Sequence, residues 1–293
     1  KLYFRGENSN HELRTPSLYL QEGLTLRGSE YYYRMLLSEL GRDDYQENSS
    51  LVRLISELQH YGAKTRVLDI TSNPLIALYF AVEKNDDKSG YVFIYKSDEE
   101  NEKFDTGHTI AIKSALNLIP QKIINNFLKA INFICKDESE LEKLENVPLE
   151  KLNDILEYKL RKINKVKIRE LEASIVKFME LLNQRARVRE RLNLPFKIAM
   201  DLGKAHIVIP SKTTDRIRQQ QGAFIYPKFT DTSDKTHEEV KKEISESINH
   251  FNATLKIQKE DKTCLLSVIR IDGNNKEISE SINHFNATLK IQK

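Results

Sequence analysis

The stretch from residue 51 to residue 83 constrains the fold of this chain more than any other. Apolar residues recur at helical spacing over Leu51–Leu58 and predict a helix with one apolar face, which Gly62 can end. A short buried strand is predicted over residues 65–70. Asn73-Pro74 then supplies a capping side chain and a first-turn proline for a second helix. A chain that alternates helix and strand in this way folds around a sheet.

The first residues of the chain predict another strand. Tyr3 and Phe4 precede Arg5, and Gly6 follows, which is typical of a strand that ends in a turn. Such a strand delivers an arginine to the edge of a sheet, where the cation can meet an anion.

These two stretches carry a family resemblance. Residues 2–7 contain Phe-Arg-Gly, and residues 58–82 contain Gln-His-Tyr-Gly, Thr-Arg-Val-Leu-Asp, Asn-Pro and Ala-Leu-Tyr-Phe-Ala in that order. Together they resemble the FRG domain, a prokaryotic domain whose name supplies no biochemical function. Arg216-Ile217, followed by Gln-Gly-Ala-Phe at residues 221–224, resembles a later Arg-Ile and Gln-Gly-Phe motif of that family.

Composition limits what the chain can be. Its 293 residues, 39% hydrophobic and 30% charged, suffice for one large domain or two smaller ones with a real core. No apolar run approaches the ~20 residues that cross a bilayer, so we expect no membrane partner and a cytoplasmic protein. Cys135 and Cys264 lack metal-ligand spacing, and the histidines form no metal motif, so we expect no metal site.

Residues 113–200 differ in character from their surroundings. Apolar residues recur at spacings of three and four from Leu149 to Ile163 and from Ile168 to Leu182, a coiled-coil-like seam. Because the family motifs lie on both sides, we interpret this region as a helical insertion. The predicted organisation is residues 1–112, the first part of the FRG domain; 113–200, a helical hairpin or small bundle; and 201–293, the second part. The insertion could serve packing alone, or a homodimer contact, or a lid over a substrate.

The C-terminal part predicts further strands at His206–Ile209, Gly222–Tyr226 and residues 265–271. Residues 242–259 recur letter for letter at residues 276–293. An identical 18-residue copy is too perfect for a diverged structural repeat, and the fold should need only one. The predicted fold class is α+β, with a small mixed or antiparallel sheet, flanking helices and the long helical insertion.

Polar residues near the mouths of the predicted loops form the candidate site. Several have a purely structural alternative: an ion pair between Arg5 and Asp69, a helix end at His60-Tyr61, and a core position for Tyr79. The candidates for catalysis are Arg5, His60, Asp69 and Gln221, and those for cofactor binding are Arg5, Gly6, Glu7, Tyr61, Arg66, Thr71, Ser72 and Tyr79.

The order of these residues resembles the mono-ADP-ribosyltransferase fold. That resemblance implies that Arg5 holds a phosphate or ribose of NAD, that Thr71-Ser72 shapes the nicotinamide pocket, and that Gln221 lies near the position of the catalytic glutamate. A glutamine cannot carry the charge that stabilises an oxocarbenium ion. Either Glu7 or Asp69 therefore serves, or the site binds a nucleotide without transferring it, while His60 could act as acid or base.

Two functions remain open at this point. The first is an effector of anti-phage defence or of a toxin system, with an ADP-ribosyltransferase-like or NAD glycohydrolase pocket and a protein or nucleic-acid target. The second is a sensor module that binds a nucleotide or nucleic acid without turnover. Its contact surface would include Arg185, Arg187, Arg189 and Arg191, although alternation by two spreads these over several helix faces. The net charge of +3 favours neither.

Overall fold

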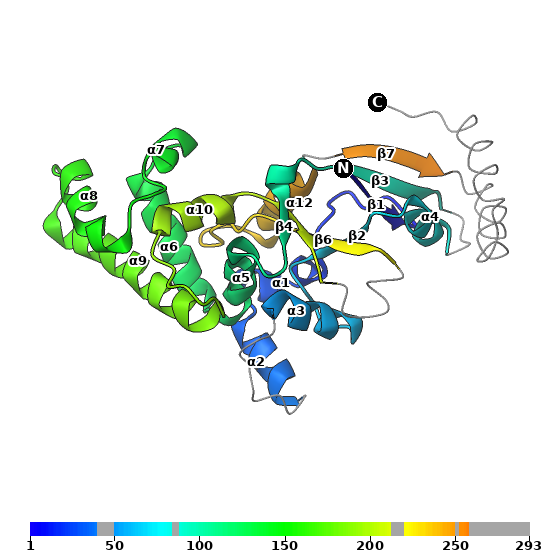
Figure 1. Cartoon of the computed structure of the whole chain (residues 1–293), viewed down its shortest axis with the longest axis horizontal. Coiled ribbons are helices and arrows are strands. Elements are labelled where there is room, and N and C mark those ends of the chain that lie inside the picture. The colour runs from blue at the N-terminus through cyan, green and yellow to red at the C-terminus, as the bar shows by residue number, and fades with distance from the viewer. Residues whose placement is uncertain (40–49, 84–87, 212–219, 250–251, 258–293) are drawn as a thin grey trace.

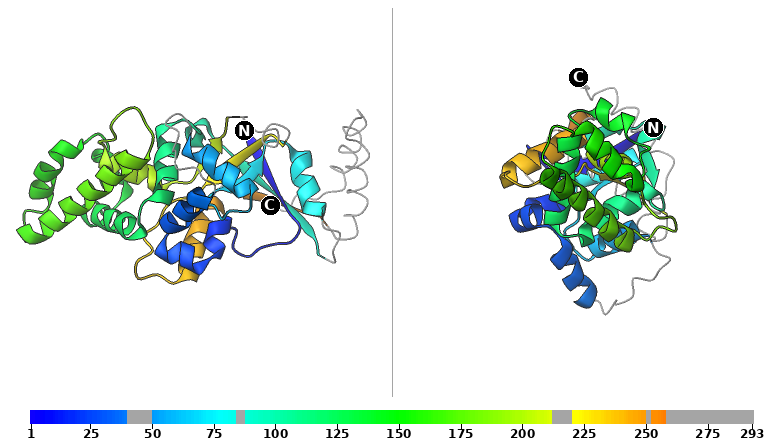
Figure 2. Two further views of the ribbon diagram at one scale, coloured as in Figure 1. Left: turned by 90° about the horizontal axis from the view of Figure 1, so that it is seen from below. Right: turned by 90° about the vertical axis from the view of Figure 1, so that its left-hand side faces the viewer.

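The computed structural model describes residues 1–39, 50–83, 88–211, 220–249 and 252–257. A mixed sheet occupies one end of the molecule, and a group of helices occupies the other (Figure 1). Figure 2 shows the same elongated arrangement in its left view, while its right view looks at the molecule end-on, from the side of the helices. The predicted α+β class is confirmed.

The described strands form one seven-stranded sheet in the order β4-β5-β6-β2-β1-β3-β7. Neighbouring strands are antiparallel, except for β4 and β5, which are parallel. The N-terminal strand β1 therefore lies inside the sheet, between β2 and β3. The strands are β1 (Leu2–Glu7), β2 (Leu68–Thr71), β3 (Gly90–Lys96), β4 (Glu102–Phe104), β5 (His206–Ile209), β6 (Gly222–Tyr226) and β7 (Asn252–Ile257).

Helices form where the sequence supplies starts and stops. Gly62, with φ of +90°, follows the end of α3, and Asn73 Oδ1 caps α4 by accepting from the backbone N of Leu75 at 3.0 Å. Among the described residues, no helix is long and apolar enough to cross a membrane. The helices are α1 (Glu22–Arg27), α2 (Glu30–Glu39), α3 (Leu51–His60), α4 (Pro74–Val82), α5 (His108–Ala115), α6 (Gln121–Ile134), α7 (Glu138–Lys143), α8 (Leu152–Lys159), α9 (Lys165–Arg185), α10 (Pro195–Gly203) and α12 (His237–Asn249).

Helix α4 packs directly on β1, and Gly6 makes this approach possible. A Cβ atom on Gly6 would lie 1.7 Å from the carbonyl oxygen of Ala77 and 2.7 Å from the backbone N of Ala81. Gly6 pairs with Val92 inside the sheet, so the turn expected at this residue is wrong. The glycine is needed because a helix backbone crosses the strand here.

The apolar seam of the helical region is buried within one chain. Ile175, Phe178 and Leu182 on α9 are fully buried, and the ring of Phe178 stacks on that of Phe127 from α6 at 3.9 Å between centroids. Ile163 departs from the predicted seam, because it is 38% exposed. A homodimer through this region would need another surface, and the division of the chain at residues 112 and 200 stays a prediction.

The first copy of the duplicated segment builds two elements of the fold. Residues 242–249 form the last two turns of α12, and residues 252–257 form β7, which pairs with β3 along its length. The strand expected at residues 265–271, the second copy at 276–293, and the Arg216-Ile217 motif lie outside the described residues.

Candidate functional site

Strand β1 positions the first candidate residue, Arg5. Its Nε donates to Glu7 Oε1 at 2.8 Å, and its Nη1 donates to the carbonyl oxygen of Asp69 at 2.9 Å. The side chain remains 26% exposed, and Nη2 forms no hydrogen bond with the described residues. Arg5 is therefore held in one orientation while one edge of its guanidinium stays available.

Glu7 binds a second arginine that sequence reasoning missed. Its Oε1 also accepts from Arg14 Nε at 3.2 Å, and both side chains are more than 90% buried. The Arg14 guanidinium stacks 3.2 Å from the ring centroid of Phe93. The backbone N of Arg14 donates to Ser245 Oγ at 3.0 Å. Arg14 lies in a segment without periodicity or motif, so no sequence signal could have found it.

The charge balance of this cluster is positive, because two guanidinium groups share one carboxylate. Burial disfavours the charged form of Arg5, but the carboxylate of Glu7 outweighs that effect and raises the pKa of Arg5. Burial raises the pKa of nearby Tyr95 to about 12 against the opposing charges of Arg14 and Arg5, so its phenol is neutral at pH 7. Arg5, Arg14 and Glu7 together therefore carry one excess positive charge, and the Asp69 carboxylate acts on Arg5 as a further, weaker charge.

Asp69 accepts the hydrogen bond from Arg5 through its backbone carbonyl, and its carboxylate acts on Arg5 only as a nearby charge. Because Phe4 pairs with Thr71, Arg5 lies opposite Ile70, and the side chains of Arg5 and Asp69 leave opposite faces of the sheet. The expected ion pair between them is replaced by the pair of Arg5 with Glu7. The exposed carboxylate of Asp69 accepts instead from Gln59 Nε2 of α3 at 2.6 Å.

Thr71, Ser72 and Gln221 tie the end of β2 to the start of β6. Thr71 Oγ1 donates to the carbonyl oxygen of Gln220 at 2.6 Å and accepts from the backbone N of Asn73 at 3.0 Å. Ser72 Oγ lies 3.3 Å from Gln221 Oε1, and its backbone N donates to the Gln221 carbonyl oxygen at 3.2 Å. Gln221 has φ of +46°, in the left-handed region. These residues thus have structural partners, whatever else they bind.

The remaining tyrosine and histidine candidates come from α4 and from the end of α3. Tyr61 follows α3 and is 75% exposed, while Tyr79 packs from α4 into a small core with Phe4 and lies edge-on to Phe80 at 5.8 Å. His60 is the last residue of α3, and its side chain lies outside what the structure describes.

Arg66 points into the main core. It is 3% exposed, and its guanidinium donates to Tyr19 OH at 3.1 Å and Gln121 Oε1 at 3.4 Å. The ring centroid of Phe229 lies 5.1 Å away. Within the described part of the chain Arg66 forms no ion pair. Neutral hydrogen-bond acceptors and aromatic rings therefore stabilise its buried charge.

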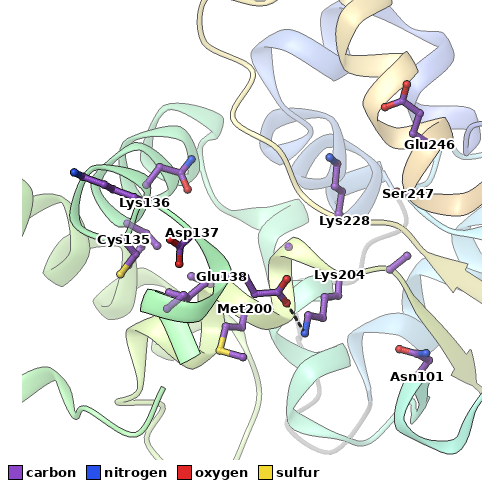
Figure 3. Close-up of a pocket in the computed structure, with 16 residues that line it drawn as sticks. Asn101, Cys135, Lys136, Asp137, Glu138, Met200, Lys204, Lys228, Glu246 and Ser247 are labelled. Atoms are coloured by element: carbon purple, nitrogen blue, oxygen red, sulfur yellow. Dashed lines mark ion pairs between the residues drawn. The ribbon is translucent and has the colours of Figure 1, made fainter. Parts of the chain in front are cut away.

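A cavity of about 860 Å³ lies elsewhere, and sequence reasoning did not predict it. Figure 3 shows Lys204 pointing toward Glu138 across it, with the ion pair drawn at 2.8 Å. Its walls come from α6, α7, α10 and α12, and they include Cys135 and Lys228 but none of the candidate residues named above.

Comparison with known proteins bears on the N-terminal part of the chain. No curated protein matches the chain, and no solved structure does. Residues 1–90 match the family model of the FRG domain. The matched segment runs from β1 through α3, β2 and α4 to the first residue of β3, and so includes the cluster of Arg5, Glu7 and Asp69. The first 90 residues of this chain are therefore an FRG domain.

Proposed function

We propose that this chain is an FRG-domain effector of anti-phage defence or of a toxin system, and that Arg5 binds a phosphate of NAD or of a related nucleotide. The observation that carries the proposal is the geometry of Arg5, which is fixed by Glu7 and the Asp69 carbonyl and keeps one edge open. A positive cluster held this way suits an anionic ligand.

The open edge determines how a phosphate can bind. Nη2 carries two N–H groups, and Nη1 keeps a second N–H besides the one that it donates to the Asp69 carbonyl. A phosphate can therefore accept from both nitrogens, in the bidentate contact by which a guanidinium holds two phosphate oxygens. The link between β1 and β2 at Asp69 can stay in place when a dinucleotide binds.

If NAD is cleaved, Asp69 is the more accessible of the two candidate carboxylates, but its side chain leaves the sheet on the face opposite that of Arg5, so a ligand held by Arg5 must extend to that face to meet it. Glu7 is 5% exposed and already neutralises two arginines, whereas Asp69 is exposed and oriented by Gln59. In hydrolysis, the bond from ribose C1′ to the nicotinamide nitrogen breaks, water oxygen adds at C1′, and one proton leaves to solvent. The carboxylate stabilises the positive charge on the ribosyl group and accepts that proton. In transfer, a protein or nucleic-acid group replaces the water.

The decisive experiment measures nicotinamide release and the NAD-dependent rise in melting temperature of the whole chain. We expect Arg5→Ala and Arg5→Lys to lose both, because lysine keeps the charge but not the planar fork. Asp69→Asn should retain the melting shift and lose release about 100-fold or more. Arg53→Ala, an exposed arginine of α3, is the matched control and should behave as the parent.

The outcomes separate the alternatives. Full nicotinamide release by both folded Arg5 variants would overturn the role of Arg5. A melting shift without release in the parent would favour binding without turnover, which agrees with Glu7 being occupied by two arginines and with the neutral amide at Gln221. For the biological role, bacteria that express the chain should resist phage, and Arg5→Ala at equal expression should abolish that resistance.

The sensor alternative through the four arginines of residues 185–191 has less support. Arg185 ends α9 and is half-buried like Arg187, whereas Arg189 and Arg191 are exposed in the segment before α10. Arg187 also has a left-handed backbone, with φ of 49°. These side chains do not form one continuous exposed surface along a helix.

A further inference from the structure

The connection between α8 and α9 is strongly basic. Residues 158–169, here called the hairpin tip, contain six lysines and arginines and no acidic residue. The hairpin tip lies at the end of the molecule away from β1, β3 and β7 (Figures 1 and 2). The basic residues are Lys159, Arg161, Lys162, Lys165, Lys167 and Arg169.

Most of this charge has no ion-pair partner among the described residues. Lys159 pairs with Glu140 at 3.0 Å, and Lys167 pairs with Glu170 at 3.2 Å. The other four cations are exposed and form no ion pair with any residue that the structure describes. Like charges held this close repel one another, so a polyanion would relieve the repulsion. These four are Arg161, Lys162, Lys165 and Arg169.

Apolar and aromatic side chains lie between the cations. Tyr158 is 77% exposed, Val166 is 61% exposed and Ile163 is 38% exposed. Surfaces that bind single-stranded nucleic acid combine cations for the phosphates with an aromatic ring on which a base stacks. Tyr158, near the end of α8, provides an exposed ring in the same basic segment.

The four unpaired cations extend from the connection before α9 into the first two turns of that helix. Lys165 and Arg169 are four residues apart on α9, so they share a face and lie about 6 Å apart along its axis. Arg161 and Lys162 lie in the connection that precedes α9. A flat membrane surface would meet only the end of the hairpin, whereas a nucleic-acid strand can lie along its side.

We propose that the hairpin tip is a binding surface for single-stranded nucleic acid. Arg161, Lys162, Lys165 and Arg169 contact successive phosphates, and Tyr158 stacks on a base. This surface is separate from the cluster around Arg5, so the inference stands independently of the function proposed above.

The test is the affinity of the whole chain for a fluorescent 30-nucleotide single-stranded RNA of mixed sequence, measured by anisotropy at several salt concentrations. Changing the four unpaired cations to glutamate should weaken binding about 100-fold or more and reduce the slope of log K against log salt by about 3. Tyr158→Ala should weaken binding about 5- to 100-fold. All five positions are exposed, so the variants should fold, which circular dichroism will check.

The matched control carries the same change of charge on the same helical region. Lys122, Lys143, Lys151 and Lys197 are exposed, and their change to glutamate should leave most of the affinity intact. An equal loss in this control would overturn the proposal, because net charge alone would then explain binding. So would the absence of RNA and single-stranded DNA binding at low salt, or binding only to vesicles that contain phosphatidylserine. Nicotinamide release should be unchanged in the hairpin-tip variants, which keeps this test distinct from that of Arg5.

Discussion

Gly6 lies so close to Ala77 that a Cβ atom on the glycine would be 1.7 Å from the Ala77 carbonyl oxygen. The backbone of α4 thus rests directly on β1, and the only neighbour that could yield is the helix itself. This contact gives a physical reason for the third residue of the Phe4-Arg5-Gly6 motif. It also holds α4, and the Thr71–Asn73 turn that starts it, against the strand that carries Arg5.

Replacing Gly6 by alanine should therefore destabilise the fold. We expect Gly6→Ala to lower the free energy of unfolding by about 3 kcal/mol, because backbone atoms cannot rotate away from the new methyl group. Urea denaturation measures this change. Gly23→Ala in α1 is the control: a Cβ there meets nothing within 4 Å, and the protein should become about 0.5–1 kcal/mol more stable. Equal effects of the two substitutions would contradict the packing argument.

The cap of α4 offers a second prediction. Asn73 Oδ1 accepts from the backbone N of Leu75, so Asn73→Ala should cost about 1 kcal/mol of stability. Thermal unfolding at fixed pH measures the loss. Asn153→Ala, at an exposed position inside α8, removes the same side chain without a cap and should change stability by less than about 0.5 kcal/mol. A larger loss at residue 153 than at residue 73 would exclude a dominant capping role.

Lys113 should make stability depend on pH. It is fully buried in α5, where Nζ donates to the carbonyl oxygens of Lys204 and Pro227, and burial lowers its pKa from 10.5 to about 7, against the raising effect of Asp201. Between these pKa values the unfolded chain binds a proton that the folded chain does not. The free energy of unfolding should therefore rise by ~2 kcal/mol from pH 7 to pH 9.

The comparison variant for this prediction is Lys113→Met. The unfolding free energy of this variant should not rise between pH 7 and pH 9. Subtracting its pH dependence from that of the parent removes the contributions of other titrating groups. The ring of Tyr226 lies 5.7 Å from Lys113 Nζ, and its phenol stays protonated between pH 7 and pH 9 because burial raises its pKa above 10. The same slope in both proteins would show that Lys113 does not titrate as expected.

The stacked pair on α6 and α9 should anchor the helical region. Phe127 is fully buried against Phe178, and Phe127→Ala should cost about 3–5 kcal/mol. Phe133 lies on the same helix and is 45% exposed, so Phe133→Ala should cost less than about 1 kcal/mol. Denaturant titration followed by circular dichroism measures the free energy of unfolding of both variants. Similar losses of stability in Phe127→Ala and Phe133→Ala would argue against a packed α6–α9 core.

Local signals predicted the elements around the site well. Asn73-Pro74 specifies the start of α4 through one side-chain hydrogen bond and a missing N–H, and both effects act within three residues. Gly62 ends α3 for a similarly local reason. The interpretation of Gly6 as a turn failed because its cause lies in α4, more than 70 positions away, and no local pattern encodes that approach.

The candidate site shows the same limit. Sequence alone placed Arg5 and Asp69 near each other, which the structure supports, but the alternation of side chains across β1 and β2 decides that they meet through a carbonyl oxygen. Arg14 was missed because its partners, Glu7 and Ser245, come from opposite ends of the chain. The cavity beside Lys204 depends on how four helices pack, which periodicity does not determine.

The separation of Arg14 and Ser245 in the sequence also determines when, during synthesis, the cluster around Glu7 can form. Their hydrogen bond joins residues 231 positions apart. At a synthesis rate of ~5–20 residues per second, about 10–50 s pass between the emergence of one and of the other from the ribosome. During that interval Ser245 and Asn249 of α12 cannot bind Arg14. A nascent chain therefore carries an unfinished version of this cluster until α12 has left the ribosome and folded.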